Sequence, residues 1–444
     1  MKDALPQTIY LQDYKVSAFA IEKTDLVFDL GEESSRVTAT LAVVRNPLSD
    51  EPAADLVLHG SEGLDLQSVK VDGVQLEEGA YTRDSESLTI SGLPDSATIT
   101  TDVLIKPQLN TTMMGLYKSR TMYCTQCEAE GFRDITYYLD RPDVMSEFTS
   151  KVIADKATYP VLLSNGNPIA SGDLDGGRHF VTWHDPFKKP AYLFALVAGT
   201  LSVVEDSFKT MSGRDIKLQI FVEEKDLDKC DHAMLSLKNS MRWDEETYGR
   251  EYDLDIFMIV AVDDFNMGAM ENKGLNIFNT SAVLANPKTT TDASFQRVEG
   301  IVAHEYFHNW SGNRVTCRDW FQLSLKEGFT VYRDSQFSAD MNSATVKRIE
   351  DATYLRTHQF AEDGGPMSHP VQPDSYMEIN NFYTLTVYEK GAEVVGMYHS
   401  LLGDELFRKA TDLYFDRHDG QAVTIEEFVK AMEDASGRDF TQFR

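Results

Sequence analysis

The stretch His304-Glu305-Tyr306-Phe307-His308 contains the residues of this chain best suited to metal chemistry. Two histidines four residues apart on a helix point the same way, so both imidazoles can bind one zinc ion. Glu305 lies between them and can reach a water molecule bound to that ion. Because a pattern of five residues also occurs by chance, a buried helix with two hydrogen-bonded histidines is the alternative interpretation of the motif alone.

A catalytic zinc usually takes three protein ligands and keeps one position for water. Glu327, nineteen residues beyond His308 and near the start of a predicted helix, is the best candidate for the third ligand. A competing interpretation is a capping box, because Ser324 and Glu327 have the required spacing. The histidine pair upstream favours the ligand interpretation. Two neutral imidazoles and one carboxylate leave a zinc site with net positive charge, which suits the stabilisation of an oxyanion.

Asp334 follows Glu327 by seven residues and falls on the same face of the predicted helix. Such a carboxylate could accept a hydrogen bond from a zinc-binding histidine and orient its ring. A solvated surface acid is the alternative.

The segment Gly268-Ala269-Met270-Glu271-Asn272 comes after an apolar strand. Its small residues and extended pattern suggest an edge segment that could pair with the backbone of a peptide substrate. Glu271 would then be a fixed acid at the cleft. By residue type alone, a surface turn with one solvated glutamate is the stronger interpretation.

Length and composition narrow the class of protein. A chain of 444 residues is expected to form two or more domains. The net charge of −29, from 42 basic and 71 acidic residues, argues against a nucleic-acid partner and against binding to anionic membranes. A solvated acidic surface accounts for most of this charge.

The four cysteines are too few for a disulfide framework. Cys124 and Cys127 form one Cys-x-x-Cys pair, and Cys230 and Cys317 are isolated. Buried thiols are therefore favoured over a structural zinc site or a redox function.

Residues 1–10 lack a basic start and an apolar stretch, so we expect no secretory signal. No apolar run is long enough for a membrane-spanning helix. These features predict a cytoplasmic protein.

Residues 1–200 are predicted to form a β domain, an antiparallel sandwich or saddle, because short alternating or β-branched runs recur between turns. These runs are 24–30, 36–44, 64–71, 87–90, 97–105, 148–154 and 180–184. From 201 to 444 the pattern becomes mixed and then mostly helical. It predicts strands at 216–222 and 254–262, a helix at 227–241 with Asp226 as N-cap, and helices at 324–337, 344–360, 387–402, 404–413 and 424–435. Thr424 and Glu427 match a capping box for the last helix.

Together, HExxH, a glutamate after eighteen intervening residues and the upstream Gly-Ala-Met-Glu-Asn resemble the M1 family of zinc aminopeptidases. The resemblance covers essentially the whole chain. It implies a multidomain β plus α+β fold, in which an N-terminal β domain precedes a thermolysin-like catalytic domain with a small sheet and a mostly helical second half. Family members continue into further β and helical domains, so we expect this chain to be a fragment.

The resemblance also assigns roles to residues. It implies one Zn²⁺ per chain held by His304, His308 and Glu327, with Glu305 as general base and Tyr388 stabilising the tetrahedral oxyanion. Glu271, Glu128 and Gln126 match the residues that hold the free α-ammonium of the substrate, which would explain the Cys-x-x-Cys without a metal. Met267 matches a side chain that shapes the first specificity pocket. The other substrate-binding residues implied are Gly268, Ala269, Met270 and Asn272.

The implied function is a broad-specificity metallo-aminopeptidase of the membrane alanyl aminopeptidase type (EC 3.4.11.2), acting as a monomer on peptides with a free N-terminus. Charge-assisted hydrogen bonds of roughly 1.5–3 kcal/mol each would discriminate against internal peptide bonds, which offer no ammonium. Two alternatives stay open. One is an epoxide hydrolase of the same family. The other is a truncated and inactive peptide-binding module.

Overall fold

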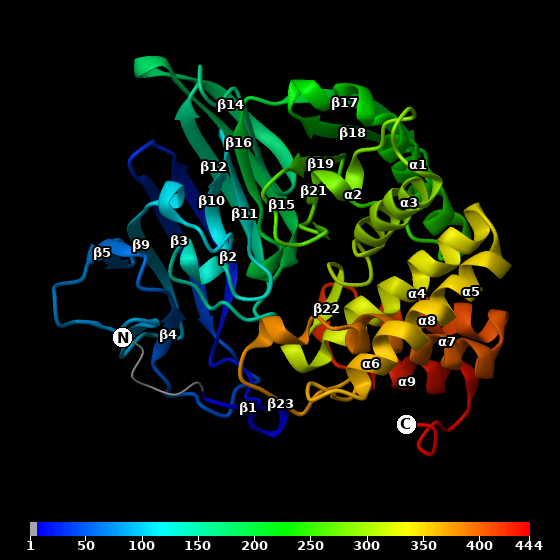
Figure 1. The fold of residues 1–444 in the computed structure, drawn as a ribbon. Helices are drawn as coiled ribbons and strands as arrows, with labels where there is room; N and C mark the ends of the chain where they lie inside the picture. The colour runs from blue at the N-terminus through cyan, green and yellow to red at the C-terminus, as the bar shows by residue number, and fades with distance from the viewer. Residues whose placement is uncertain (1–6) are drawn as a thin grey trace.

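The computed structural model describes residues 7–444, so the first part of the segment in which we expected no secretory signal lies outside the described residues. Figure 1 shows a β-rich part built from the first half of the chain and a helical part built from the last third, with a mixed α and β region joining them. The expected order, a mostly β N-terminal part followed by a largely helical part, is confirmed.

The largest sheet has eight strands in the order β14-β15-β12-β2-β3-β9-β5-β6. Along β12 every second residue is buried, which is the burial pattern of a strand with one face on the core. The sheet is antiparallel except that β12 pairs with β2 in parallel. The strands are β2 (Phe19–Asp29), β3 (Ser35–Arg45), β5 (Asp65–Val71), β6 (Val74–Gln75), β9 (Ser96–Ile105), β12 (Ser146–Asp155), β14 (Asn167–Leu174) and β15 (Arg178–Lys189).

Two smaller sheets complete the β-rich part. The four-stranded sheet has the order β10-β11-β16-β13 and the three-stranded one the order β4-β8-β7. A cluster of aromatic rings, including the stacked pair Phe28 and Phe194, fills the core of this part. The strands are β4 (Leu56–His59), β7 (Thr82–Arg83), β8 (Ser87–Ile90), β10 (Gly115–Ser119), β11 (Met122–Gln126), β13 (Val161–Ser164) and β16 (Leu196–Gly199).

A five-stranded sheet follows in the order β17-β18-β19-β21-β20. Its central strand β19 is buried at all seven positions and pairs in parallel with both neighbours, as expected for a continuous apolar run. The short strand β20 lies at the edge, as its sequence suggested. The strands are β17 (Ser202–Lys209), β18 (Asp215–Val222), β19 (Ile256–Val262), β20 (Ala269–Met270) and β21 (Leu275–Asn279).

Helices pack on this sheet and fill the last third of the chain (Figure 1). The α3–α4 pair is central to the site, and α7, α8 and α9 pack beside α4 in one apolar core. The helices are α1 (Asp231–Thr247), α2 (Thr280–Val283), α3 (Asp292–Phe307), α4 (Leu323–Met341), α5 (Ala344–Tyr354), α6 (Phe360–Asp363), α7 (Gly391–Leu402), α8 (Asp404–His418) and α9 (Ile425–Ser436).

Three helix predictions need comment. Asp226 is not an N-cap, because Glu224–Lys229 forms a 3-10 turn, Asp226 binds Lys229 and α1 begins only at Asp231. The predicted helix 344–360 is interrupted by a π-helical turn at Leu355–Gln359. The capping box of Thr424 and Glu427 at α9 is confirmed.

Two short ladders tie distant parts of the chain together. β1 (Ile9–Tyr10) pairs with β23 (Ser375–Tyr376), and β22 (Val315–Cys317) pairs in parallel with β24 (Gln421–Val423). The second ladder fixes the segment that connects α3 to α4, and therefore helps to set where these two helices meet.

Candidate active site

Helix α3 presents the histidine pair at its C-terminal end. Thr291 caps its N-terminus by accepting a hydrogen bond from the backbone of Ser294. The helix ends at Phe307, and His308 is its C-cap residue. Gly312, at φ 150°, lies so close that a Cβ there would approach His308 Nδ1 to 2.8 Å. A glycine is therefore needed for the chain to turn back beside this ring.

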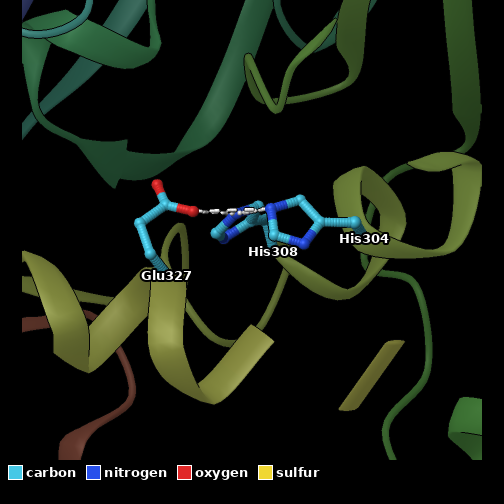
Figure 2. Close-up of side chains that lie close together, drawn as sticks. All are labelled: His304, His308 and Glu327. Atoms are coloured by element: carbon cyan, nitrogen blue, oxygen red, sulfur yellow. Dashed lines mark hydrogen bonds and ion pairs between the residues drawn. The ribbon is translucent and has the colours of Figure 1, made fainter. Parts of the chain in front are cut away.

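His304, His308 and Glu327 point toward one another (Figure 2). The two Nε2 atoms are 3.0 Å apart. Glu327 Oε2 lies 3.4 Å from His304 Nε2 and 3.3 Å from His308 Nε2. We call these three residues the metal-binding cluster, because their side-chain atoms could hold one metal ion. The sequence placed Glu327 near the histidines, and the structure brings all three together.

In each histidine, the ring nitrogen that faces away from the cluster, Nδ1, makes a hydrogen bond that fixes the orientation of the ring. His308 Nδ1 lies 2.9 Å from the backbone oxygen of Ser311, and His304 Nδ1 lies 2.7 Å from Asp334 Oδ2. A carbonyl oxygen only accepts, so His308 Nδ1 carries a proton and donates it to Ser311. Asp334 forms the contact that its position on α4 allowed, so the surface-acid interpretation is wrong.

The cluster favours a positive charge at its centre. Within residues 7–444, Glu327 Oε2 is buried and has no hydrogen-bond partner. Burial lowers the pKa of His304, but the neighbouring carboxylates of Asp334 and Glu327 outweigh it and raise this pKa well above its usual range. Burial raises the pKa of Glu327, yet Lys326 and His308 hold it well below its usual range. A buried carboxylate oxygen without a partner, beside two imidazoles, fits a bound cation such as zinc.

Glu305 lies on α3 between the two histidines and is buried. Burial raises the pKa of its carboxyl well above its usual range, against the opposing effect of His304. In the part of the chain that the structure describes, its Oε2 atom is buried without a hydrogen-bond partner. A carboxylate with a raised pKa is a better proton acceptor at neutral pH.

The capping interpretation of Glu327 is wrong. Helix α4 begins at Leu323 and has Gln322 as N-cap without a side-chain hydrogen bond. The Ser324 hydroxyl instead donates to the backbone oxygen of Val371 at 2.6 Å. The carboxylate of Glu327 is therefore free to face the histidines.

A second group of charged side chains surrounds Lys326, which the sequence analysis did not identify. Lys326 Nζ lies 2.7 Å from Glu128 Oε1, 2.7 Å from Glu271 Oε1 and 2.6 Å from Glu327 Oε1. We call Glu128, Glu271 and Glu327 with Lys326 the carboxylate–lysine cluster. All four side chains are at least 96% buried. No sequence signal identified Lys326, because its burial follows from the structure, in which every position from 323 to 331 is buried.

Glu271 reaches this cluster from the end of the edge strand. It is 3% exposed, so the interpretation as a solvated surface turn is wrong. Its backbone oxygen accepts a hydrogen bond from the Asn313 side chain at 2.9 Å, which links β20 to the turn after α3. Burial raises the pKa of Glu271, but His308 and Lys326 lower it below its usual value.

Gln126 and Glu128 come from the end of β11 in the β-rich part. The Gln126 amide donates to the backbone oxygen of Glu128 at 3.2 Å and contacts Met270 Sδ at 3.7 Å. Among the described residues its Oε1 atom is buried without a donor, so it could accept a hydrogen bond from a ligand. Burial raises the pKa of Glu128 to about 8, although Lys326 opposes the shift. Tyr383, also absent from the sequence analysis, donates to Glu128 Oε1 at 2.9 Å.

Tyr388 lies in a π-helical turn, Thr386–Lys390, that leads into α7. Its ring is nearly parallel to that of His304, with centroids 6.3 Å apart. Burial raises its pKa well above the usual value, so the phenol stays a hydrogen-bond donor. Helix α4 approaches this turn closely, because a Cβ on Gly328 would lie 2.9 Å from the backbone of Gly391.

The remaining predicted substrate-binding residues lie on or beside β20, next to Glu271 in the chain. Met267 is half-buried against a core that also contains Met270. Ala269 and Met270 pair with Phe278 and Ile277, while Gly268 accepts a backbone hydrogen bond from Asn279 at 2.9 Å. Asn272 closes the turn by accepting from the backbone of Leu275 at 3.0 Å.

All four cysteines are buried and unpaired, as predicted. Burial raises the pKa of the Cys124 thiol to about 12, which leaves it protonated at neutral pH.

Among residues 7–444, no helix is long and apolar enough to cross a lipid bilayer.

Fold and site together place acids from the β-rich part beside a candidate metal site on α3 and α4. Comparison with known families identifies the family. The Peptidase M1 N-terminal domain matches residues 22–193, and the Peptidase family M1 domain matches residues 232–444. The chain belongs to peptidase family M1.

Similar proteins carry consistent names. The chain is 58% identical to Aminopeptidase N of Caulobacter vibrioides over 100% of this chain and 51% of that protein. It is 56% identical to Aminopeptidase N of Escherichia coli over 99% of this chain and 50% of that protein. The crystal structure of Legionella pneumophila aminopeptidase A in complex with aspartic acid has a TM-score of 0.93 at 37% identity, covering 98% of this chain and 50% of that one.

The chain spans about half the length of the curated relatives it matches. These relatives are named as aminopeptidases, which gives no support to the epoxide-hydrolase alternative. The complete set of buried acids and imidazoles in the site gives no support to an inactive peptide-binding module.

Proposed function

We propose that this chain provides the catalytic centre of a zinc-dependent aminopeptidase that removes the N-terminal residue from peptides. One observation carries the proposal. The metal-binding cluster and the carboxylate–lysine cluster share Glu327, so a site for a hydrolytic metal lies directly beside fixed acids that can bind an ammonium group. An aminopeptidase needs this adjacency, because it must measure one residue from a free amine.

The proposed roles follow from the geometry. His304, His308 and Glu327 would hold one Zn²⁺, which when bound would polarise the scissile carbonyl and acidify a water molecule. Glu305 accepts a proton from the attacking water and returns it to the leaving amine. Tyr388 donates a hydrogen bond to the carbonyl oxygen as negative charge develops there.

The substrate's ammonium group is proposed to bind Glu271, Glu128 and the unpaired Oε1 of Gln126. The backbone beside Gly268, Ala269, Met270 and Asn272 would hold the extended peptide, with Met267 at the side chain of its first residue. The open space beside Gly268, where a Cβ would meet nothing within 4 Å, supports an approach from this side.

Finer properties are part of the same proposal. We infer broad specificity that includes alanine, as in EC 3.4.11.2, together with a cytoplasmic, monomeric protein. Four unpaired cysteines support the reducing compartment. A β domain of residues 1–200 and a catalytic domain of residues 201–444 are supported by β17, which begins at Ser202 and joins the five-stranded sheet.

Alanine p-nitroanilide and its N-acetylated form test the function directly. We expect the zinc-loaded chain to cleave the free-amine substrate and a chelator to abolish cleavage until zinc is returned. Hydrolysis of the acetylated substrate at an equal rate would contradict an aminopeptidase. No cleavage of either substrate by a chain shown to contain zinc would contradict the proposal that this half carries the activity by itself.

A further inference from the structure

We propose that Lys326 is a positioning residue of the site with two roles. Its ammonium group holds Glu128 and Glu271 in place for the substrate's ammonium. It also keeps a second divalent metal ion from binding between the carboxylates of Glu128, Glu271 and Glu327. The inference rests on the proposed function for its substrate. Its metal-exclusion part depends only on the geometry of the cluster.

The first support is the way in which Lys326 fills the cluster. An ammonium group has three N–H donors, and Lys326 Nζ has three carboxylate oxygens at 2.6–2.7 Å, one from each glutamate. The contacts with Glu271 and Glu327 are hydrogen bonds, and the contact with Glu128 is an ion pair. The side chain is 1% exposed, so Lys326 acts on the substrate through the glutamates and does not bind it.

The second support is what the glutamates would do without this lysine. Oxygens of Glu128, Glu271 and Glu327 lie within 4.8 Å of one another, a spacing suitable for a metal ion. Oxygen-rich sites of this kind suit divalent cations, and like charges this close and buried repel strongly. The position that a second metal ion could take is thus filled by a group that the chain itself supplies.

The third support is that the lysine contacts one oxygen of each carboxylate and leaves the other oxygen available. It binds Oε1 of Glu327, which leaves Oε2 facing the two histidines. It likewise binds Oε1 of Glu128 and of Glu271, while their Oε2 atoms make no hydrogen bond to another residue between 7 and 444. These two free oxygens are the ones available to a substrate ammonium.

The surroundings keep the lysine in place. Its Nζ lies 5.4 Å from the centre of the Tyr192 ring, a favourable cation–π contact. Tyr383 donates to the same Glu128 oxygen that Lys326 binds. Tyr192 belongs to the β-rich part and Tyr383 to the helical part. Lys326 and its partner Glu128 are therefore contacted from both parts of the chain.

Metal content and kinetics of Lys326→Met test the inference. After equilibration with excess zinc and removal of free metal, we expect one zinc in the wild type and two in Lys326→Met. Adding Glu271→Gln to Lys326→Met should return the count to one. For a free-amine anilide we expect KM to rise about 10- to 100-fold with a smaller change in kcat, because the ammonium loses correctly held charge-assisted bonds.

Controls separate this role from a purely structural one. Lys189→Met removes another buried lysine, paired with Asp185 outside the cluster, and should leave one zinc and an unchanged KM. Lys326→Arg keeps the charge and should keep one zinc. One zinc and an unchanged KM in a folded Lys326→Met would overturn the proposal.

If Lys326→Met does not fold, titration of the wild type with Co²⁺ still decides the question. We expect a single site, and a second site lost in Glu128→Gln would overturn the proposal. An inactive wild type with one zinc would contradict the proposed function alone, because the metal counts do not depend on turnover.

Discussion

The metal-binding cluster and the carboxylate–lysine cluster meet at Lys326 and Glu327, neighbours on α4, yet they treat charge in opposite ways. Two imidazole nitrogens converge on Glu327 Oε2, which has no hydrogen-bond partner among residues 7–444, so the first cluster fits an external cation. The second contains its own cation, Lys326, at hydrogen-bond distance from three acids. Glu327 belongs to both, with one oxygen facing each way.

The difference teaches how a site can combine hydrolysis with recognition of a free amine. A metal ion does chemistry only where a coordination position stays open, whereas a recognition site must keep its charge fixed. Under the proposed function, one cation would come from solution and the other from the chain, and a single carboxylate would separate the two tasks. Substitutions in the two clusters should therefore change different quantities.

The largest effect is expected from Glu305→Gln, which keeps the shape of the side chain and removes the proton acceptor. We expect kcat to fall about 10²- to 10⁴-fold, the range typical of general acid–base catalysis. Zinc content, measured by elemental analysis, should stay at one per chain. Near-normal turnover at full zinc occupancy would exclude Glu305 as the base.

A smaller and different effect is expected from Glu271→Ala, which acts on the second cluster. Loss of one charge-assisted bond to the ammonium should raise KM for a free-amine anilide about 10- to 100-fold. The preference for this substrate over its N-acetylated form should shrink. Zinc content should not change, and an unaltered preference would show that Glu271 does not bind the amine.

The smallest effect on turnover is expected from Asp334→Asn, which changes the partner of His304 without removing a ligand. Zinc affinity should weaken about 10- to 100-fold, as for other residues that orient metal-binding histidines. Turnover at saturating zinc should stay close to that of the wild type. The exposed change Asp215→Asn is the control, and equal zinc affinities in the two variants would contradict a supporting role for Asp334.

The two clusters also differ in how far the sequence could predict them. His304, Glu305 and His308 lie on one helix, and Glu327 follows after a fixed short connection, so their spacing predicted the metal-binding cluster. Glu128 and Glu271 could be assigned only by family resemblance, because β11 and β20 meet α4 through tertiary packing. Lys326 was missed because a lysine beside a glutamate on a helix is ordinarily solvated.

The fold likewise has features that the sequence could predict and features that it could not. Strands that begin with alternating apolar residues, such as β8 and β18, begin and end close to their predicted positions. The parallel pairing of β12 with β2 could not be predicted, since local periodicity does not specify which strand is the neighbour. The sequence predicted one helix over 387–402, whereas the structure has a π-helical turn at Thr386–Lys390, which contains Tyr388, before α7 begins at Gly391.

An anomalous difference map at the zinc edge, from crystals soaked in excess zinc, tests the central claim most directly. The account predicts one peak, within bonding distance of His304 Nε2, His308 Nε2 and Glu327 Oε2, and no peak beside Lys326 between Glu128 and Glu271. A zinc peak between Glu128 and Glu271 in the wild type, or no peak at the histidines, would contradict it.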